Sequence, residues 1–176
     1  MSEILKKLLV VCCSLAMCLL CACGTISTEE ASSYTDVEAS ADAEAGTCTI
    51  AIDCKTVLDN MDKLDKAKTA IIPEDGVILA ETVVHYNAGD SVLDVLKQVT
   101  RDNKIAMEFE DSPAYGGGYV EGIANLYEFD CGDTSGWEFC VNGWFPNYSS
   151  ENYEVGDGDV ILWRYSCDNG KDIETE

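Results

Sequence analysis

The stretch Gly136–Cys167 constrains the fold of this chain more than any other segment. It contains all three tryptophans of the sequence, set in short runs of aromatic and β-branched residues. Two turn signals divide these runs. Asn142-Gly143 is typical of a two-residue β-hairpin, and the Gly-Asp-Gly-Asp sequence at 156–159 favours a tight chain reversal. The segment therefore predicts short strands joined by tight turns.

The strand predicted at the end of this segment, residues 159–167, is apolar on both faces. A strand that is apolar on both faces is typical of the interior of a sheet, so we expect this one in a central position. The first strand of the folded part shows one buried face. Its alternating pattern places four residues on that face, Cys48, Ile50, Ile52 and Cys54.

Between these two strands the pattern predicts one helix and several further strands. Asp90-Ser91 predicts a helix cap, because apolar residues recur at helical spacing from there to residue 103. Residues 111–119 predict a loop, since three successive glycines allow positive φ or a close backbone approach. The remaining strands are predicted at residues 81–90, 105–110, 126–131 and 137–141. This order predicts a small α+β domain.

The composition is strongly acidic. Eleven Lys and Arg stand against 33 Asp and Glu, which gives a formal net charge of −22. A polyanion is repelled by nucleic acid and by anionic membrane surfaces, so the composition argues against binding to either through charge. Such a charge favours solubility and carries no information about fold.

The N-terminus has the pattern of an export signal. Lys6 and Lys7 precede an apolar run that ends near Leu20, which is short for a membrane-spanning helix. The sequence Leu20-Cys21-Ala22-Cys23 resembles the lipobox of bacterial lipoproteins. The resemblance implies cleavage after residue 22 and a lipid on Cys23. Each buried CH₂ contributes about 0.8 kcal/mol, so two or three acyl chains anchor a protein stably. A signal that releases a soluble secreted protein is the alternative.

Three parts of the chain follow from these patterns. Residues 1–22 are predicted to be a lipoprotein signal peptide. Residues 23–46 combine the lipidated Cys23 with an acidic segment rich in Ser, Thr and Ala, which predicts a disordered linker. Residues 47–176 are predicted to be the folded domain. The expected location is extracytoplasmic, with the chain anchored to the cell membrane.

Five cysteines remain in the predicted mature chain once Cys23 carries lipid, and an odd number leaves at least one unpaired. Disulfides are compatible with an exported protein. If the first and last strands run parallel, Cys54 and Cys167 lie near the same end. The expected pairs are then Cys54–Cys167 and Cys48–Cys131, which leaves the thiol of Cys140 free.

No pattern of residues predicts catalysis or a metal centre. The only histidine, His85, lies in an alternating strand, and such a residue is more often a surface or packing residue than a catalyst. No nucleophile, base and oxyanion site are brought together by a known motif. The acids at 157 and 159 are explained as turn residues, although a calcium ion at this turn is the alternative. We expect the protein not to be an enzyme and to require no cofactor.

A family resemblance is carried by three segments in order, CTIAIDC, YVEGIANLYEFDCGDTSGWEFCVNGWFPNY and YEVGDGDVILWRYSCD. Within them the most specific matches are Ser135–Trp137 leading to Val141–Gly143, and Gly156–Asp159 leading to Trp163–Tyr165. Together they resemble the transcobalamin-like C-terminal domain, also called DUF4430, over about residues 48–169. The resemblance implies a β-grasp-like fold, in which a sheet curls round one main helix and the first and last strands pair in parallel.

The resemblance also implies a ligand and a place for it. In the cobalamin carriers of animals, the related domain covers one face of the corrin ring. The segments that approach the ligand there are similar to Tyr115–Val120 and Trp137–Pro146. The expected function is therefore that of a cell-surface lipoprotein with a small-ligand-binding module, with cobalamin or a related corrinoid as its ligand. The alternative is a surface adhesion module that binds a protein or a glycan.

Thirteen residues are candidates for contact with the ligand. They share either a place beside the glycine run or a place in the tryptophan-rich segment: Tyr115, Gly117, Gly118, Tyr119, Val120, Trp137, Phe139, Val141, Asn142, Gly143, Trp144, Phe145 and Tyr148. A flat apolar ring gains from aromatic faces and a few orienting polar groups. For Trp137 and Trp163 a role in the core alone is the favoured explanation. The chain lacks the large helical domain of the animal carriers, so a partner would have to cover the second face of a ligand.

Overall fold

The computed structural model describes residues 44–114 and 116–173. It has two sheets and a few helices, which confirms the α+β class. In chain order, the elements are β1 (Glu44–Asp53), α2 (Lys55–Leu58), the 3₁₀ helix η1 (Lys66–Ile71), β2 (Val77–Asn87), α3 (Val92–Asp102), β3 (Met107–Ser112), β4 (Gly117–Ile123), β5 (Leu126–Tyr127), β6 (Gly136–Val141), the 3₁₀ helix η2 (Ser150–Asn152) and β7 (Val160–Ser166).

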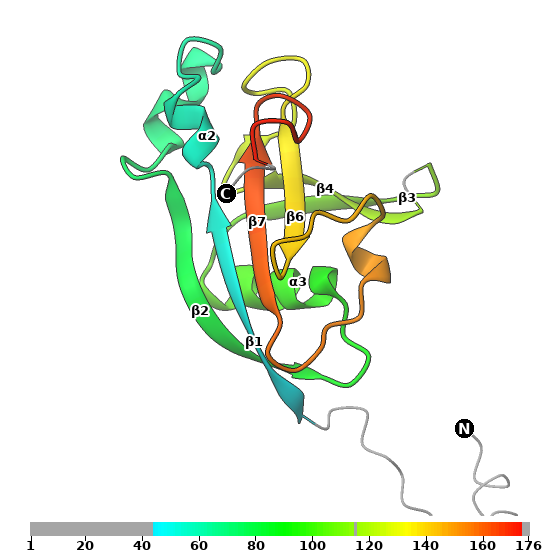
Figure 1. The fold of residues 1–176 in the computed structure, drawn as a ribbon. Coiled ribbons are helices and arrows are strands. Elements are labelled where there is room, and N and C mark those ends of the chain that lie inside the picture. The colour runs from blue at the N-terminus through cyan, green and yellow to red at the C-terminus, as the bar shows by residue number, and fades with distance from the viewer. Residues whose placement is uncertain (1–43, 115, 174–176) are drawn as a thin grey trace, which may run out of the picture. The chain divides into compact units, whose positions relative to one another are not determined.

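The larger sheet has the strand order β2-β1-β7-β6. Strands β1 and β7 pair in parallel, from Thr49 opposite Val160 to Asp53 opposite Arg164. The neighbours β2 and β6 pair antiparallel to them, and Figure 1 shows β1, β7 and β6 side by side. Two predictions are thereby confirmed, because the first and last strands are parallel and β7 lies inside the sheet.

Strand β1 buries the predicted face, with all four alternating residues from Cys48 to Cys54 in the core. Asp53 lies on the opposite face and is also buried. Its carboxylate accepts two hydrogen bonds from Arg164, from Nε at 2.9 Å and from Nη2 at 3.0 Å. A buried carboxylate is tolerated where such a bidentate partner satisfies it.

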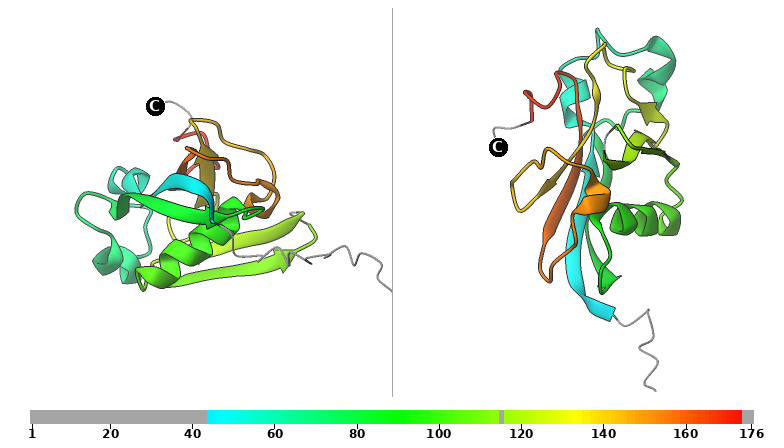
Figure 2. Two further views of the ribbon diagram at one scale, coloured as in Figure 1. Left: turned by 90° about the horizontal axis from the view of Figure 1, so that it is seen from below. Right: turned by 90° about the vertical axis from the view of Figure 1, so that its right-hand side faces the viewer.

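Helix α3 begins at the predicted cap. The Ser91 hydroxyl accepts from the Asp94 N–H, and the Asp94 carboxylate accepts from the Ser91 N–H, which is a capping box. The apolar residues at helical spacing are buried: Val92, Leu93, Val95, Leu96 and Val99. Figure 2 shows α3 on one face of the larger sheet, so this apolar stripe closes the core.

The second sheet was not predicted. It has the order β3-β4-β5, and β4 includes Gly117 and Gly118, which the sequence assigned to a loop. Gly117 pairs with Ser112 and Gly118 with Asp111, in a regular antiparallel ladder. A Cβ at Gly118 would lie 2.5 Å from Cδ2 of Leu93, so this glycine lets β4 approach α3. The glycine run serves close packing as well as chain reversal.

The predicted boundary between the linker and the folded domain differs from the observed one. Strand β1 begins at Glu44, so residues 44–46 of the predicted linker belong to the strand. The predicted signal peptide and the lipid site at Cys23 lie outside the described residues. Within the described residues, no helix has the length and apolar character needed to span a membrane.

The predicted disulfide pairs are wrong in this structure. All five cysteines of the described residues are free thiols, and all five are buried. The register of β1 and β7 places Asp53 opposite Arg164, so Cys167 lies beyond the level of Cys54. The sulfur of Cys167 instead lies 3.4 Å from that of Cys131. The strand register thus separates Cys54 from Cys167. Cys131 lies next to Cys167, whereas it was predicted to pair with Cys48.

Candidate ligand-binding groove

A groove of about 570 Å³ lies beside β6. β6 is an edge strand of the larger sheet. The other walls come from Gly118–Val120 of β4, from residues 128–129 and 133–135, and from the segment Pro146–Ser150. The groove therefore gathers residues from both sheets and from the tryptophan-rich segment. A cavity of this size is within the range that holds small ligands.

The floor of the groove is aromatic. Trp137 and Phe139 of β6 contribute to it together with Trp163 of β7, and all three are largely buried. The rings of Phe139 and Trp163 pack with their centroids 5.6 Å apart. The core explanation for Trp137 and Trp163 is thus correct for most of each ring, and the remaining edges line the groove.

The two indole N–H groups of this floor differ. That of Trp137 donates to the backbone oxygen of Leu126 at 2.9 Å. That of Trp163, whose side chain is only 2% exposed, is buried with no hydrogen-bond partner among the described residues. A buried donor without a partner is unfavourable by about 1–3 kcal/mol.

Polar and acidic groups surround the aromatic floor. The hydroxyl of Tyr119 donates to the Glu128 carboxylate at 2.6 Å, which fixes both side chains at the rim. Asp133, Glu138 and Asn169 also line the groove. Burial raises the pKa of the Glu138 carboxyl above its ordinary value. The groove thus combines an apolar floor with an acidic margin.

Replacing Glu138 with glutamine should change the pH dependence of stability. Its raised pKa means that folding disfavours the charged form, so native stability is reduced as the pH rises through the folded pKa. Glu138→Gln should therefore increase the free energy of unfolding at neutral pH. The gain should vanish well below the unfolded glutamate pKa of about 4.3. Denaturant unfolding at both pH values measures this, and exposed Glu110→Gln controls for the loss of one negative charge. An equal gain from both variants would contradict the argument.

The wall formed by β4 is tied to η2 by specific hydrogen bonds. The Glu151 carboxylate accepts from the Gly118 N–H at 2.7 Å. The Ser149 hydroxyl donates to the Gly118 oxygen at 2.9 Å, and the Asn152 amide donates to the Gly116 oxygen at 2.8 Å. These bonds satisfy backbone groups at the end of the second sheet. They hold the start of β4, which belongs to the first predicted segment, against Ser149 and η2.

The structure brings six of the thirteen candidate residues into the groove: Gly118, Tyr119, Val120, Trp137, Phe139 and Tyr148. Tyr115 lies outside the described residues. Gly117 is in β4 but does not line the groove. Phe145 lines a smaller adjacent hollow together with Glu138 and Asn169. The two predicted segments therefore meet as expected, although not every member of them faces the groove.

The hairpin residues form the fold rather than the groove. Val141 is buried in the core. The Asn142 amide donates to Asp159 at 2.7 Å, and its oxygen accepts from the Val160 N–H at 2.9 Å. Asn142 and Gly143 both have the positive φ that a tight hairpin requires, 53° and 81°. The contact with Asn142 also explains Asp159 as a turn residue.

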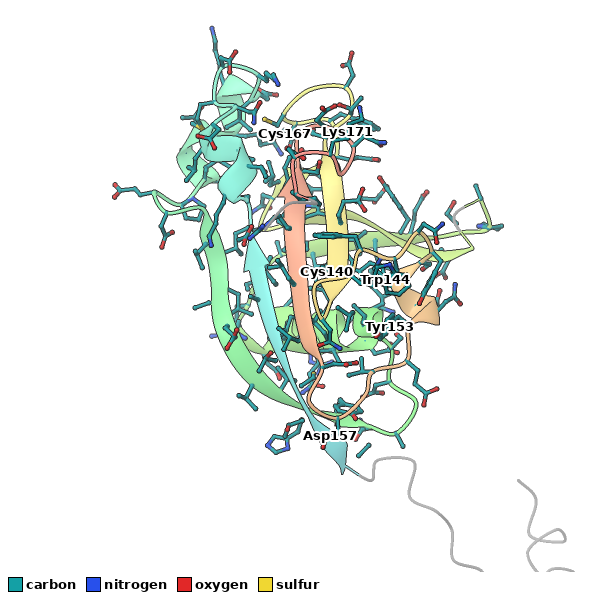
Figure 3. All side chains as sticks on the ribbon, viewed as in Figure 1. Cys140, Trp144, Tyr153, Asp157, Cys167 and Lys171 are labelled. Atoms are coloured by element: carbon teal, nitrogen blue, oxygen red, sulfur yellow. The ribbon has the colours of Figure 1, made fainter. Side chains whose placement is uncertain are left out.

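Trp144 lies past this turn and outside the groove lining. Its side chain is 53% exposed and packs on that of Tyr148, which is 42% exposed, with ring centroids 6.0 Å apart. Figure 3 shows Trp144 beside β6, away from the end of β7 that carries Cys167. The two rings thus form an exposed aromatic pair at the margin of the groove.

Sequence reasoning missed several groove residues, of which Phe129 is the clearest. Its side chain is 61% exposed, and its backbone has a φ of 67°. Positive φ is unfavourable for a bulky side chain, so the surrounding structure must hold it. The Phe129 N–H donates to the backbone oxygen of Ser135, which supplies part of that constraint. Residues 126–131 were predicted to be a strand. The strand β5 ends at Tyr127, and the turn that follows it exposes the Phe129 ring.

The fold and the groove define a class of protein, a small α+β domain with an aromatic-floored surface groove. Residues 89–167 match the family described as "Domain of unknown function (DUF4430)". The family resemblance expected from the sequence is therefore confirmed for this part of the chain. No curated protein sequence matches the chain.

Solved structures match part of the chain, and the first of them shows a similar fold. One is haptocorrin in complex with Cbi, with a TM-score of 0.51 and 17% sequence identity. The match covers 69% of this chain and 25% of the haptocorrin chain, so the present chain spans about a quarter of that protein. Another is a candidate metal-binding protein from Ruminococcus gnavus ATCC 29149, at 16% identity and a TM-score of 0.40, covering 69% of this chain and 96% of that one.

Proposed function

We propose that the protein is a binding module for a small, flat molecule, which enters the groove beside β6. The observation that carries this proposal is the groove itself, in which Trp137, Phe139 and Trp163 give an aromatic floor and Phe129 an exposed ring. A flat apolar ring would contact the edges of this floor and the exposed ring of Phe129. The role is binding without catalysis.

A corrinoid such as cobalamin is the ligand we propose. The family match at 89–167 and the haptocorrin structure with Cbi support this choice, together with the meeting of the two predicted segments. An open groove covers one face of such a ring and leaves the other in water. Affinity should therefore be modest unless a second protein covers the free face.

The wider setting is also part of the proposal. We infer that α3 and the larger sheet form a β-grasp-like arrangement, which the parallel pairing of β1 and β7 supports. We further infer export and lipid anchoring through Cys23, on the strength of the lipobox-like sequence. Labelling of cells with a fatty-acid analogue tests the anchor: the full chain should be labelled and Cys23→Ser should not. Equal labelling of both would overturn it.

Binding should depend on the exposed ring of Phe129. In a titration of the purified full chain with cobalamin, the corrin absorbance or the heat of binding reports the complex. Phe129→Ala should weaken binding about tenfold, because it removes one aromatic contact. The matched control is Phe109→Ala, an exposed phenylalanine of β3 that does not line the groove. It should bind like the unchanged protein.

Two outcomes would contradict this proposal. The corrinoid assignment fails if the full chain gives no signal at high micromolar cobalamin or cobinamide. The groove assignment fails if cobalamin binds but Phe129→Ala and Phe109→Ala weaken it equally. In that case the ligand site lies elsewhere on the protein.

A second function is favoured by the exposed pair of Trp144 and Tyr148. Exposed aromatic side chains with an apolar body and a polar tip are typical of contact surfaces for proteins and glycans. Adhesion of cells that display the protein to immobilised glycans or matrix proteins tests this. Trp144→Ala should abolish adhesion and Phe109→Ala should retain it; equal adhesion by both would exclude the pair as the contact.

A further inference from the structure

Cys131 and Cys167 form the one sulfur–sulfur contact in the described residues. Their sulfurs are 3.4 Å apart, and both side chains are buried. Cys131 lies in the turn after β5, and Cys167 directly follows β7. A disulfide has a sulfur–sulfur distance of about 2.05 Å, so bonding requires each side chain to move by less than one bond length.

The backbone around both cysteines is fixed by other contacts. The Cys131 N–H donates to the Ser135 hydroxyl at 3.1 Å. The Cys167 N–H donates to the Asp172 carboxylate at 2.8 Å. The Thr134 hydroxyl donates to the Cys167 oxygen at 3.4 Å, which links the two loops directly. The two thiols are therefore held face to face by the fold itself.

We propose that Cys131 and Cys167 are joined by a disulfide in the exported protein. The two residues are 36 positions apart, and the segment between them contains β6, the aromatic pair and the whole of β7. The bond would therefore close the part of the chain that forms the floor and one wall of the groove. It would not involve Cys48, Cys54 or Cys140.

The reaction is thiol–disulfide exchange with a small-molecule disulfide of the glutathione-disulfide class. One cysteine thiolate attacks a sulfur of that reagent, forms a mixed disulfide and releases one thiolate. The second cysteine then attacks its neighbour and releases the other thiolate. The protein pair loses two protons and two electrons, and the reagent is reduced to two thiols.

The folded state makes this reaction slow once the core has closed. Burial raises the pKa of the Cys131 thiol and that of the Cys167 thiol, so little of either is present as the reactive thiolate at neutral pH. Burial also limits access of the oxidant. The bond should therefore form mainly during folding, before the two loops pack, and it should resist reduction afterwards.

The test uses the full chain after refolding with oxidised glutathione, followed by alkylation in denaturant and peptide mass spectrometry. The expected result is a cross-linked peptide pair from Cys131 and Cys167, with Cys48, Cys54 and Cys140 alkylated. A sample refolded and kept in reductant should have a Tm about 10 °C lower than the oxidised sample, because a bond across this span restricts the unfolded chain. Cys140→Ser, at a similarly buried thiol, should keep both the cross-link and the Tm difference, whereas Cys131→Ser should lose both.

The peptide map of the unsubstituted chain keeps the test decisive even if Cys131→Ser does not fold. Alkylation of both Cys131 and Cys167 in the oxidised sample would overturn the proposal. So would a cross-link from either residue to Cys48, Cys54 or Cys140. An equal Tm for the cross-linked sample and for the sample refolded in reductant would overturn its stabilising role.

Discussion

Asp53→Ala is expected to lower the free energy of unfolding by about 3–5 kcal/mol. The change leaves the Arg164 guanidinium buried without the carboxylate that now accepts from its Nε and Nη2. The pair also joins the two central strands, because Asp53 lies directly opposite Arg164 in the β1–β7 ladder. Denaturant unfolding followed by circular dichroism measures the loss.

Two comparisons separate the buried pair from charge in general. Asp168→Ala removes an exposed carboxylate whose ion pair with Lys171 is 3.5 Å long, and it should change stability by less than about 1 kcal/mol. Replacing both buried partners, as Asp53→Val with Arg164→Met, should recover most of the loss because no unpaired charge remains. A loss from Asp53→Ala no greater than that from Asp168→Ala would contradict the role of the pair.

Tyr165→Ala is expected to cost about 3–5 kcal/mol, because it removes a fully buried ring from the centre of the core. The ring packs edge-on against Trp137, with centroids 5.3 Å apart. Its hydroxyl donates to the Tyr127 backbone oxygen at 2.7 Å and lies 2.8 Å from the Ser135 hydroxyl. Tyr165 thus contacts Trp137 and Ser135, which both line the groove.

Tyr165→Phe divides this effect into ring and hydroxyl. It keeps the ring and removes one of the two hydrogen bonds to the Tyr127 oxygen, which still accepts from the Asp130 N–H at 3.2 Å. A loss of about 0.5–1.5 kcal/mol is therefore expected. Tyr148→Ala, at an exposed ring, should cost less than about 1 kcal/mol. Thermal unfolding of the three variants measures the series. Equal losses from Tyr165→Ala and Tyr148→Ala would show that the buried ring does not support the core.

Sequence patterns correctly predicted the elements whose defining residues lie close together in the chain. The alternation in β1 and the two apolar faces of β7 identified both strands and the interior position of β7. Helix α3 was predicted within a residue of its end, because its cap and its apolar spacing are both local. These features needed no knowledge of a distant partner.

Features that depend on distant partners were missed. Gly117 and Gly118 suggest a loop until Leu93 and Glu151 are placed against them. Asp53 gives no local sign of burial, since its partner Arg164 is 111 residues away. Strand β4 and the buried ion pair therefore could not be derived from pattern alone.

The candidate site was predicted by segment more accurately than by residue. Both segments contribute to the groove, but Val141 and Asn142 serve the core and the hairpin. Phe129 and Asn169, which were not predicted, also line the groove. Both lie in turns, and both have a positive φ. A residue with positive φ does not follow the alternation of side chains along a strand. A prediction based on that alternation therefore places the side chain on the wrong face.

The parallel pairing of β1 with β7 has a consequence for folding during synthesis. A ribosome releases β1 long before β7 exists, so the central ladder must wait until the whole chain has been made. Long-range parallel pairing of this kind slows folding, since distant ends must meet before contacts form. Until β7 has been made, β1 can pair only with β2, so one edge of β1 stays unpaired.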